Sequence, residues 1–423
     1  MGFADLYLSR YGLPHHEPLP DPLPGTAIMV VIPAYGEKNL MDAVDALAAS
    51  LPDHIRAEIL CVINHPENPP REYLDLNIRS LDLIKQKSGG LKSNLKLYAI
   101  YLPDVPHKLA GVGYARKVGM DTAVSRFGLL DNPSGIIVSF DADSLCSDDF
   151  LEEVHRFFSD HPGALSANHY FEHPDCFIED GRRLAPIGLY ELHLRYFRMA
   201  LEWAAHPHAI HTVGSSFAVR VNGYIRAGGM GRHKAGEDFY FLQKMVALGH
   251  FWENNRAMVI PSSRESDRVI FGTGATMLRA GVDDRGYLTY PLVLFDHLKQ
   301  FILSNPWLNA DLKNGSWSDN PGDRPDNPLR GYLHESSLLR ELEDIEHKTA
   351  GPISRRKKFF ATLGIFEVLR YLNHSGRHGF PLLAVEGESH KLASRFKECG
   401  VDGPSLLRWY REQDHQRGVR RIT

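Results

Sequence analysis

The sequence has few cysteines and no long apolar run. Four cysteines are widely spaced and form no CxxC pair, so we expect neither a disulfide framework nor a cysteine zinc site; they are Cys61, Cys146, Cys176 and Cys399. No stretch reaches the roughly 18 uninterrupted apolar residues that a membrane-spanning helix needs. The amino-terminal residues also lack the basic start and apolar core of a secretory signal. We therefore expect a protein of the reducing cytoplasm.

An excess of charge of one sign is also missing. The formal net charge is −4, with 24% charged and 43% hydrophobic residues, so no basic surface for nucleic acid is expected. The 423 residues exceed what one hydrophobic core usually serves. We expect three parts: a Pro-rich lead-in at 1–25, an α/β domain at 26–280 and a mainly helical region at 281–423.

Strand and helix patterns alternate through the first third of the chain. Apolar runs predict strands at 27–33, 57–64, 94–102 and 136–140, and helical spacing of apolar residues follows the first and third of these. Such alternation favours an α/β fold with a mostly parallel sheet, in which ligands gather at the carboxyl ends of the strands.

Two carboxylates, Asp141 and Asp143, directly follow the apolar run Ile136 to Phe140. Alternation along a strand would place both on one side, with the small Ala142 between them. Two convergent carboxylates repel unless a cation lies between them, so the pattern suits a divalent metal that also holds a diphosphate. The alternative is an ordinary turn or helix cap.

Three further segments carry polar residues at expected element ends. PAYGEKN follows the first strand, and Gly111 and Gly113 precede Arg116 and Lys117 at a helix start, where basic groups suit a diphosphate. AGED begins another helix, in which an acid serves either as a cap or as a general base.

The order of these motifs resembles the family 2 glycosyltransferases of the GT-A fold over roughly residues 27 to 275. The matching segments are PAYGE at 33–37, GVGYARKVGMD at 111–121, DAD at 141–143, VGSSFAVR at 213–220 and GED at 236–238. The resemblance implies a Rossmann-like, mostly parallel sheet. The Gln-x-x-Arg-Trp motif of processive synthases is absent, so a non-processive enzyme is expected.

The resemblance also implies donor and metal sites. Asp143 would bind Mg²⁺ or Mn²⁺, and Asp141 would contact the ribose or the shell of the metal. The base and ribose of the donor nucleotide would be lined by Pro33, Ala34, Tyr35, Glu37 and Asn64. Its base or phosphates would be contacted by Lys108, Arg116 and Lys117. Two arginines of a later loop would reach the diphosphate, or else form surface salt bridges: Arg264 and Arg268.

In inverting members of the family, the acid of the ED motif takes a proton from the acceptor hydroxyl. Asp238 would be that base here, with Glu237 as the second choice. The acceptor side would be formed by Gly214, Ser215 and Ser216, with His211 as a further contact.

The function expected is therefore metal-dependent, inverting transfer of a hexose from a UDP- or GDP-sugar to a sugar, lipid-linked or small-molecule acceptor. A nucleotidyltransferase is one alternative, but it would carry a Gly-rich basic loop where PAYGEKN stands. A non-catalytic nucleotide-sugar binder or scaffold is the other.

Membrane contact would be at most peripheral. The basic residues 355–358 before FFATLGIFEVLRYL suit an anionic membrane surface, but the favoured interpretation is a charged start to a buried helix.

Overall fold

The computed structural model describes residues 2–13, 18–178, 181, 183–232, 236–264, 286–304, 327–396 and 403–423. The chain divides into two units. The sheet unit comprises Met1–Asp175, Thr212–Arg279 and Glu412–Thr423, and the helical unit comprises Cys176–His211 and Ala280–Arg411. Each unit is thus assembled from segments that are far apart in the sequence.

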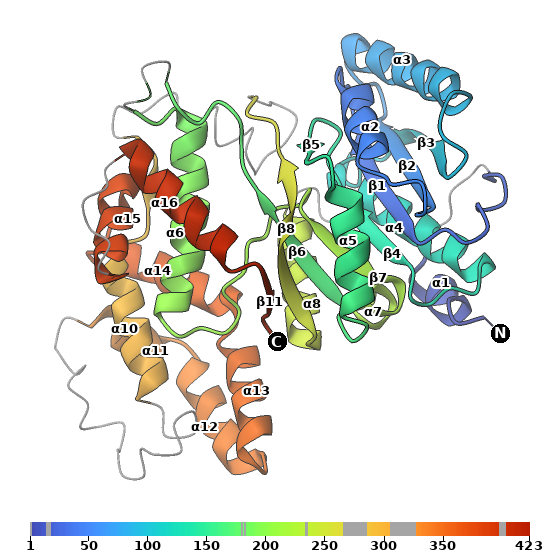
Figure 1. Ribbon diagram of the computed structural model, residues 1–423. Helices are drawn as coiled ribbons and strands as arrows, with labels where there is room; N and C mark the ends of the chain where they lie inside the picture. The colour runs from blue at the N-terminus through green and yellow to red at the C-terminus, as the bar shows by residue number, and fades with distance from the viewer. Residues whose placement is uncertain are drawn as a thin grey trace. The chain divides into compact units, whose positions relative to one another are not determined.

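A nine-stranded sheet forms the centre of the sheet unit, in the order β11-β8-β6-β7-β4-β1-β2-β3, with β5 paired to β8 (Figure 1). The strands are β1 (Ile28–Ala34), β2 (Ala57–Pro66), β3 (Leu95–Val105), β4 (Ile136–Ser139), β5 (Leu145–Cys146), β6 (Ser166–Phe171), β7 (Phe217–Arg220), β8 (Phe251–Ile260) and β11 (Val419–Arg421).

Most strands of this sheet run in one direction. β1, β2, β3 and β4 are mutually parallel. β7 lies between β4 and β6 and is antiparallel to both, so β6 runs in the same direction as β4. β8 is parallel to β6 and therefore also runs in this direction. All seven residues of β1 are buried, as expected of a strand covered on both faces. The expected α/β fold class, with a mostly parallel sheet and a mainly helical part, is confirmed.

Helices of the sheet unit are α1 (Asp5–Tyr11), α2 (Leu40–Ala49), α3 (Arg71–Ser88), α4 (Val112–Leu129), α5 (Phe150–Asp160), α7 (Val221–Arg226) and α8 (Glu237–Leu248). α4 packs closely on β1 and β2 because Gly119 has no side chain. A Cβ there would lie 2.4 Å from Val31 Cγ1 and 2.9 Å from Val62 Cγ2. This close packing fixes the start of α4 near the carboxyl ends of both strands.

The strand before the two aspartates is shorter than its apolar pattern predicts. β4 ends at Ser139, so Asp141 and Asp143 lie in the turn that follows it and not in the strand. Strand alternation therefore does not set the direction of their side chains. What sets it is the partners that the turn provides.

The helical unit contains α6 (Pro186–Trp203), α10 (Leu292–Leu303), α11 (Pro328–Glu335), α12 (Leu338–Lys348), α13 (Pro352–Thr362), α14 (Ile365–Arg377), α15 (Val385–Ala393), the 3₁₀ turn η1 (Ser394–Phe396) and most of α16 (Gly403–Gln416), with the two-stranded pair β9 (Leu288–Thr289) and β10 (Leu383–Ala384). Phe359 and Phe360, next to the basic run, are buried. Their burial agrees with a charged start to a core helix. Within the described residues, no helix has the length and apolar character needed to cross a bilayer.

Buried charges attach the amino-terminal residues to the sheet unit. Glu58 on β2 accepts hydrogen bonds from Arg126 Nε and from the backbone of Leu23, both at 2.6 Å. Asp121 on α4 accepts one from the Tyr7 hydroxyl of α1 at 2.8 Å. The residues expected as a Pro-rich lead-in thus include a helix held by specific contacts.

Candidate functional site

Each aspartate of the turn after β4 accepts a hydrogen bond from an arginine. Asp141 Oδ1 accepts a hydrogen bond from Arg116 Nη2 at 2.6 Å, and Asp143 Oδ2 accepts one from Arg264 Nε at 2.9 Å. The two carboxylate side chains remain partly exposed, at 36% and 24%. Both lie at the carboxyl end of β4, beside β1, where a parallel sheet gathers its ligands.

Arg116 joins Asp141 to the start of α8. It lies in the second turn of α4, its side chain is only 3% exposed, and its Nη1 donates to the Glu237 carboxylate. The adjacent Asp238 also interacts electrostatically with the guanidinium. One buried cation therefore faces three carboxylates.

The backbone before α8 places these two acids. Gly236 has φ +73°, in the left-handed region that favours glycine, and α8 begins at the next residue. Asp238 Oδ1 accepts the backbone N–H of Phe239 at 2.7 Å, so it satisfies one of the free donors of the first turn. Carboxylates near a helix amino terminus are also favoured by its dipole. Asp238 Oδ2 lies toward Gly214.

Gly214 lies against this cluster. A Cβ at Gly214 would lie 2.7 Å from Asp238 Oδ2 and 3.2 Å from both terminal nitrogens of Arg116. The Ser139 hydroxyl, at the end of β4, donates to the Gly214 carbonyl at 2.7 Å. The segment expected on the acceptor side is thus tied to the strand that carries the aspartates.

The two neighbouring serines differ in their contacts. Ser216 Oγ donates to the His169 carbonyl at 2.9 Å, whereas the buried Ser215 Oγ has no hydrogen-bond partner among the described residues. Ser215 therefore has a spare donor and acceptor.

The pKa values of the clustered acids are raised. Burial raises the pKa of Glu237 to about 7, against the opposing effect of Arg116 and with the help of the Asp238 charge. Burial also raises the pKa of Asp141 to about 6, although water screens part of this effect because a third of the side chain is exposed. The pKa of Asp238 is raised by burial as well. The cluster therefore holds protons more readily than isolated acids do.

Arg264 links Asp143 to the loop after β1. Its Nη2 donates to Glu37 Oε1 at 2.6 Å. Gly36, at φ +60°, shapes this loop, and its backbone N–H donates to Asn77 Oδ1 at 2.8 Å. Glu37 is thereby brought to the same edge of the sheet as Asp143.

Asn77 is a site-shaping residue that the sequence reasoning missed. From α3 it also donates to the carbonyl of Asn64 at 3.4 Å, so one buried amide fixes the ends of β1 and β2. The available signal was a single asparagine among the inward positions of an amphipathic helix. Tyr35, in the same loop, packs its ring edge-on against Tyr73 at 5.2 Å between centroids.

The other predicted residues have varied surroundings. Pro33 and Ala34 are buried in β1, and Lys108 is exposed between β3 and α4. Lys117 makes an ion pair with Asp121 at 2.9 Å, away from the acids bound by Arg116. His211 is buried in the helical unit. Arg268 lies outside the described residues.

The donor set of the turn fits a hard divalent cation. Asp141 and Asp143 offer only carboxylate oxygens, and the charge of Asp143 itself raises the pKa of Asp141. Mg²⁺ is commonly held by one or two carboxylates together with phosphate oxygens and water. The two partly exposed carboxylates in the turn after β4 match this donor set. Each of them already pairs with a positively charged arginine.

No protein-family model matches this chain, and no curated protein matches it. Solved structures that are similar include S. aureus TarS 1-349 in complex with UDP-GlcNAc, at 14% identity over 84% of this chain and 93% of that chain, with a TM-score of 0.39. GalNAc-T7 with UDP, GalNAc and Mn²⁺ is similar at 15% identity over 73% of this chain and 54% of that chain, with a TM-score of 0.38.

The mannosyltransferase PcManGT from Pyrobaculum calidifontis, in complex with GDP-Man and Mn²⁺, is similar at 16% identity over 88% of this chain and 91% of that chain, with a TM-score of 0.36. At such identities and TM-scores, these similarities are too weak to transfer a site or an activity. The functional argument therefore depends on the residues of this chain.

Proposed function

We propose that this protein is a non-processive glycosyltransferase that moves a hexose from a nucleotide-diphosphate sugar to an acceptor hydroxyl. The observation that carries the proposal is the convergence of Asp141 with Glu237 and Asp238 on Arg116, at the carboxyl end of β4. The ligand carboxylates expected of a metal-diphosphate site and the acids expected of a proton acceptor thus meet at one edge of the sheet.

The donor would bind along the carboxyl ends of β1, β2 and β4. Glu37 and Asn64 would contact base and ribose, and Asp143 with Asp141 would hold Mg²⁺ or Mn²⁺, which supplies Lewis-acid neutralisation of the leaving diphosphate. Arg264 already contacts both Glu37 and Asp143, so its guanidinium is positioned to reach the diphosphate after exchanging its partner.

Asp238 would be the general base of an inverting displacement. The acceptor oxygen forms a bond to the anomeric carbon, the bond from that carbon to the diphosphate oxygen breaks, and the hydroxyl proton passes to the Asp238 carboxylate. Burial raises the pKa of Asp238, which makes its ionised form a stronger proton acceptor. Arg116 would hold Glu237 and Asp141 in place around the reacting groups.

Two alternative functions would need different residues at this site. A nucleotidyltransferase needs basic donors in the loop after β1, but this loop presents the acid Glu37 beside Gly36. A non-catalytic binder would need Asp143 and the donor loop but would have no use for Asp238. Substitution at Asp238 therefore separates catalysis from binding.

The test is Asp238→Asn, assayed with a panel of UDP- and GDP-sugars for both transfer and binding. We expect the transfer rate to fall by about 10²- to 10⁴-fold, the usual contribution of a general base, while the donor affinity stays within about threefold. Asp149→Asn is the matched control, because Asp149 also lies at a helix start but on the exposed surface.

Normal transfer by Asp238→Asn would contradict its assignment as the base. Donor binding with no transfer by any variant, including the wild type, would favour the binder. Thermal stabilisation by each nucleotide, with and without Mn²⁺ or Mg²⁺, identifies the donor, because a ligand of the folded state raises the unfolding temperature.

A further inference from the structure

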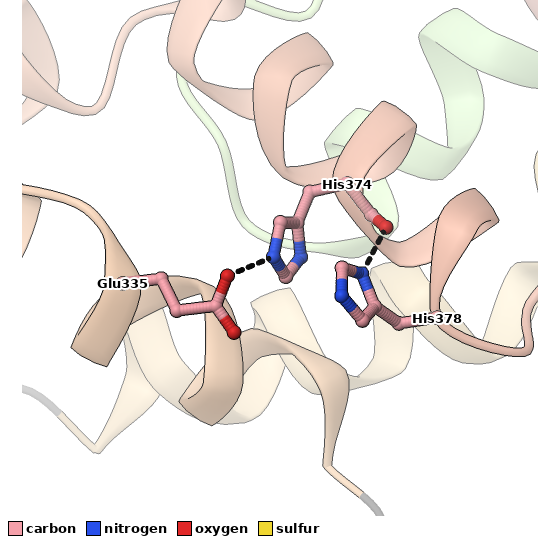
Figure 2. Close-up of side chains that lie close together, drawn as sticks. All are labelled: Glu335, His374 and His378. Carbon is pink, nitrogen blue, oxygen red and sulfur yellow. Dashed lines mark hydrogen bonds and ion pairs between the residues drawn. The ribbon is translucent and has the colours of Figure 1, made fainter.

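A second group of ionisable side chains lies in the helical unit. Glu335 is the last residue of α11, and His374 and His378 lie one turn apart at the end of α14, so both imidazoles are on one face. Figure 2 shows the His374 ring between the Glu335 carboxylate and the His378 ring. Among the described residues, no other group of three such side chains has its potential metal ligands so close together.

The distances suit a shared metal ion. One ligand atom from each of the three residues lies within 4.8 Å of the other two, and His374 Nε2 is 2.9 Å from Glu335 Oε2. Ligands at about 2.1 Å from a tetrahedral ion are about 3.4 Å apart, so changes of about 1 Å in side-chain position would complete the geometry.

A hydrogen bond to the backbone prepares the His378 imidazole as a ligand. His378 Nδ1 lies 2.8 Å from the His374 carbonyl, which only accepts, so Nδ1 carries the proton and Nε2 of the neutral ring has a free lone pair. A backbone carbonyl in this role is the usual outer partner of a metal-bound histidine. His374 Nδ1 is buried with no hydrogen-bond partner among the described residues.

The local charge also favours a cation. Glu335 and His378 lie at the carboxyl-terminal ends of their helices, where the helix dipole is negative. The two imidazole rings are stacked with centroids 4.1 Å apart, so both side chains lie at the same place beside the Glu335 carboxylate.

We propose that Glu335, His374 and His378 form a binding site for a transition-metal ion of the Zn²⁺, Ni²⁺ or Co²⁺ kind. Imidazole nitrogens favour these ions over Mg²⁺, whereas the oxygen-only pair Asp141 and Asp143 favours Mg²⁺ or Mn²⁺. The site does not depend on the proposed glycosyl transfer. Its bound ion joins α11 to α14.

The test is titration of the full-length protein with Zn²⁺ by calorimetry, in excess Mg²⁺ so that oxygen-only sites are occupied. We expect one Zn²⁺ per chain in the wild type, and an affinity at least about 10-fold weaker in each of Glu335→Gln, His374→Gln and His378→Gln. His334→Gln, an exposed neighbour on α11, is the matched control and should bind as the wild type does.

A second measurement distinguishes lost ligands from lost folding. Co²⁺ bound through imidazole gives visible absorption bands, which the wild type and His334→Gln should show and His378→Gln should lack at equal circular dichroism. Because His378 is exposed, we expect its substitution to leave the fold intact. Equal Zn²⁺ affinity and equal Co²⁺ spectra in the wild type and His378→Gln would overturn the proposal, leaving only a surface ion pair.

Discussion

Three carboxylates surround the guanidinium of Arg116, which has a single positive charge. Asp141 and Glu237 contact it directly and Asp238 interacts with it, all at low exposure of the arginine side chain. Burial is the main reason that the pKa values of all three acids are raised, and the charges of neighbouring acids add to it for Asp141 and Glu237. At the residue scale, the cluster holds the three acids together and binds protons more readily than isolated acids do.

The raised pKa of Glu237 predicts a pH-dependent stability. Its pKa is about 7 in the folded chain against an ordinary value of 4.5, so between these values the folded chain binds more protons than the unfolded chain. The contribution to the free energy of unfolding is present at low pH and is lost as the pH rises through about 7. Glu237→Gln does not titrate, so its stability relative to the wild type should increase with pH across this window.

Urea unfolding of both proteins at about pH 5 and about pH 8 measures this difference. Asp149→Asn serves as the reference, because the Asp149 carboxylate is exposed and accepts a hydrogen bond from Ser147. A gap between wild type and Glu237→Gln that stays the same at both values would show that Glu237 is ionised throughout.

Gly214 makes a second prediction at this scale. In Gly214→Ala, the new Cβ would lie 2.7 Å from Asp238 Oδ2, so the carboxylate must move while the backbone conformation stays allowed. We expect transfer to fall by about 100-fold, as for a misplaced catalytic group, with a much smaller loss of thermal stability. Gly163→Ala is the control, since a Cβ there meets nothing within 4 Å. Unchanged transfer in Gly214→Ala would place the reacting groups elsewhere.

At the scale of elements, buried ion pairs fix segments that apolar packing alone would leave free. Glu58, fully buried on β2, holds both Arg126 of α4 and the backbone of Leu23. The Arg126 guanidinium also stacks on the Tyr98 ring of β3 at 4.7 Å and donates to the Pro20 carbonyl at 2.8 Å. Two strands, a helix and the amino-terminal segment therefore share one pair of charges.

Removing one member of this pair should be more damaging than removing both. Glu58→Leu leaves Arg126 buried without its carboxylate, and we expect a loss of about 3–5 kcal/mol in the free energy of unfolding. In the double variant with Arg126→Met, much of that loss should be recovered. Chemical denaturation of the four proteins of the cycle gives the coupling, and a double variant no more stable than Glu58→Leu would rule out the electrostatic explanation.

How far the elements could be predicted depends on where their charges lie. The strands β1, β2 and β3 follow plain apolar patterns, and their predicted ranges agree with the structure within three residues. The helix α6 was missed because it buries Glu191, Arg195 and Arg198, which break its apolar spacing. These charges are compensated within the helix, by Arg195 with Glu191 at 2.9 Å, and by a residue far along the chain, Arg411, which lies 2.7 Å from Glu191.

The same reasoning applies to the candidate site. Asp141, Asp143, Glu237 and Asp238 could be found from the sequence because each directly follows a strand or begins a helix. The ion pairs of Asp141 with Arg116 and of Asp143 with Arg264 could not be predicted, because the partners are 25 and 121 residues apart in the sequence. Roles in catalysis, donor binding and acceptor binding remain predictions.

Across the whole molecule, two donor sets of different chemistry predict two responses to metal removal. EDTA should abolish transfer, and Mg²⁺ or Mn²⁺ should restore it through the oxygen ligands Asp141 and Asp143. Zn²⁺ bound at His374 and His378 should not restore it, but should raise the unfolding temperature of the chelated protein.

His378→Gln is the control that separates the two sites. It should lose the Zn²⁺-dependent rise in unfolding temperature and keep the Mg²⁺-dependent transfer. Full activity of the wild type after EDTA treatment and dialysis would contradict a metal-dependent mechanism.

The pairing of β11 with β8 bears on how the protein is made. Val419, Arg420 and Arg421 pair with Asn254, Glu253 and Trp252, although the chain passes through the helical unit between the two strands. While a ribosome is still synthesising the helical unit, β8 therefore presents an unpaired edge, the kind of surface at which growing chains associate wrongly. The sheet is closed on this side only when residues 419–421 emerge, after the helical unit has been made.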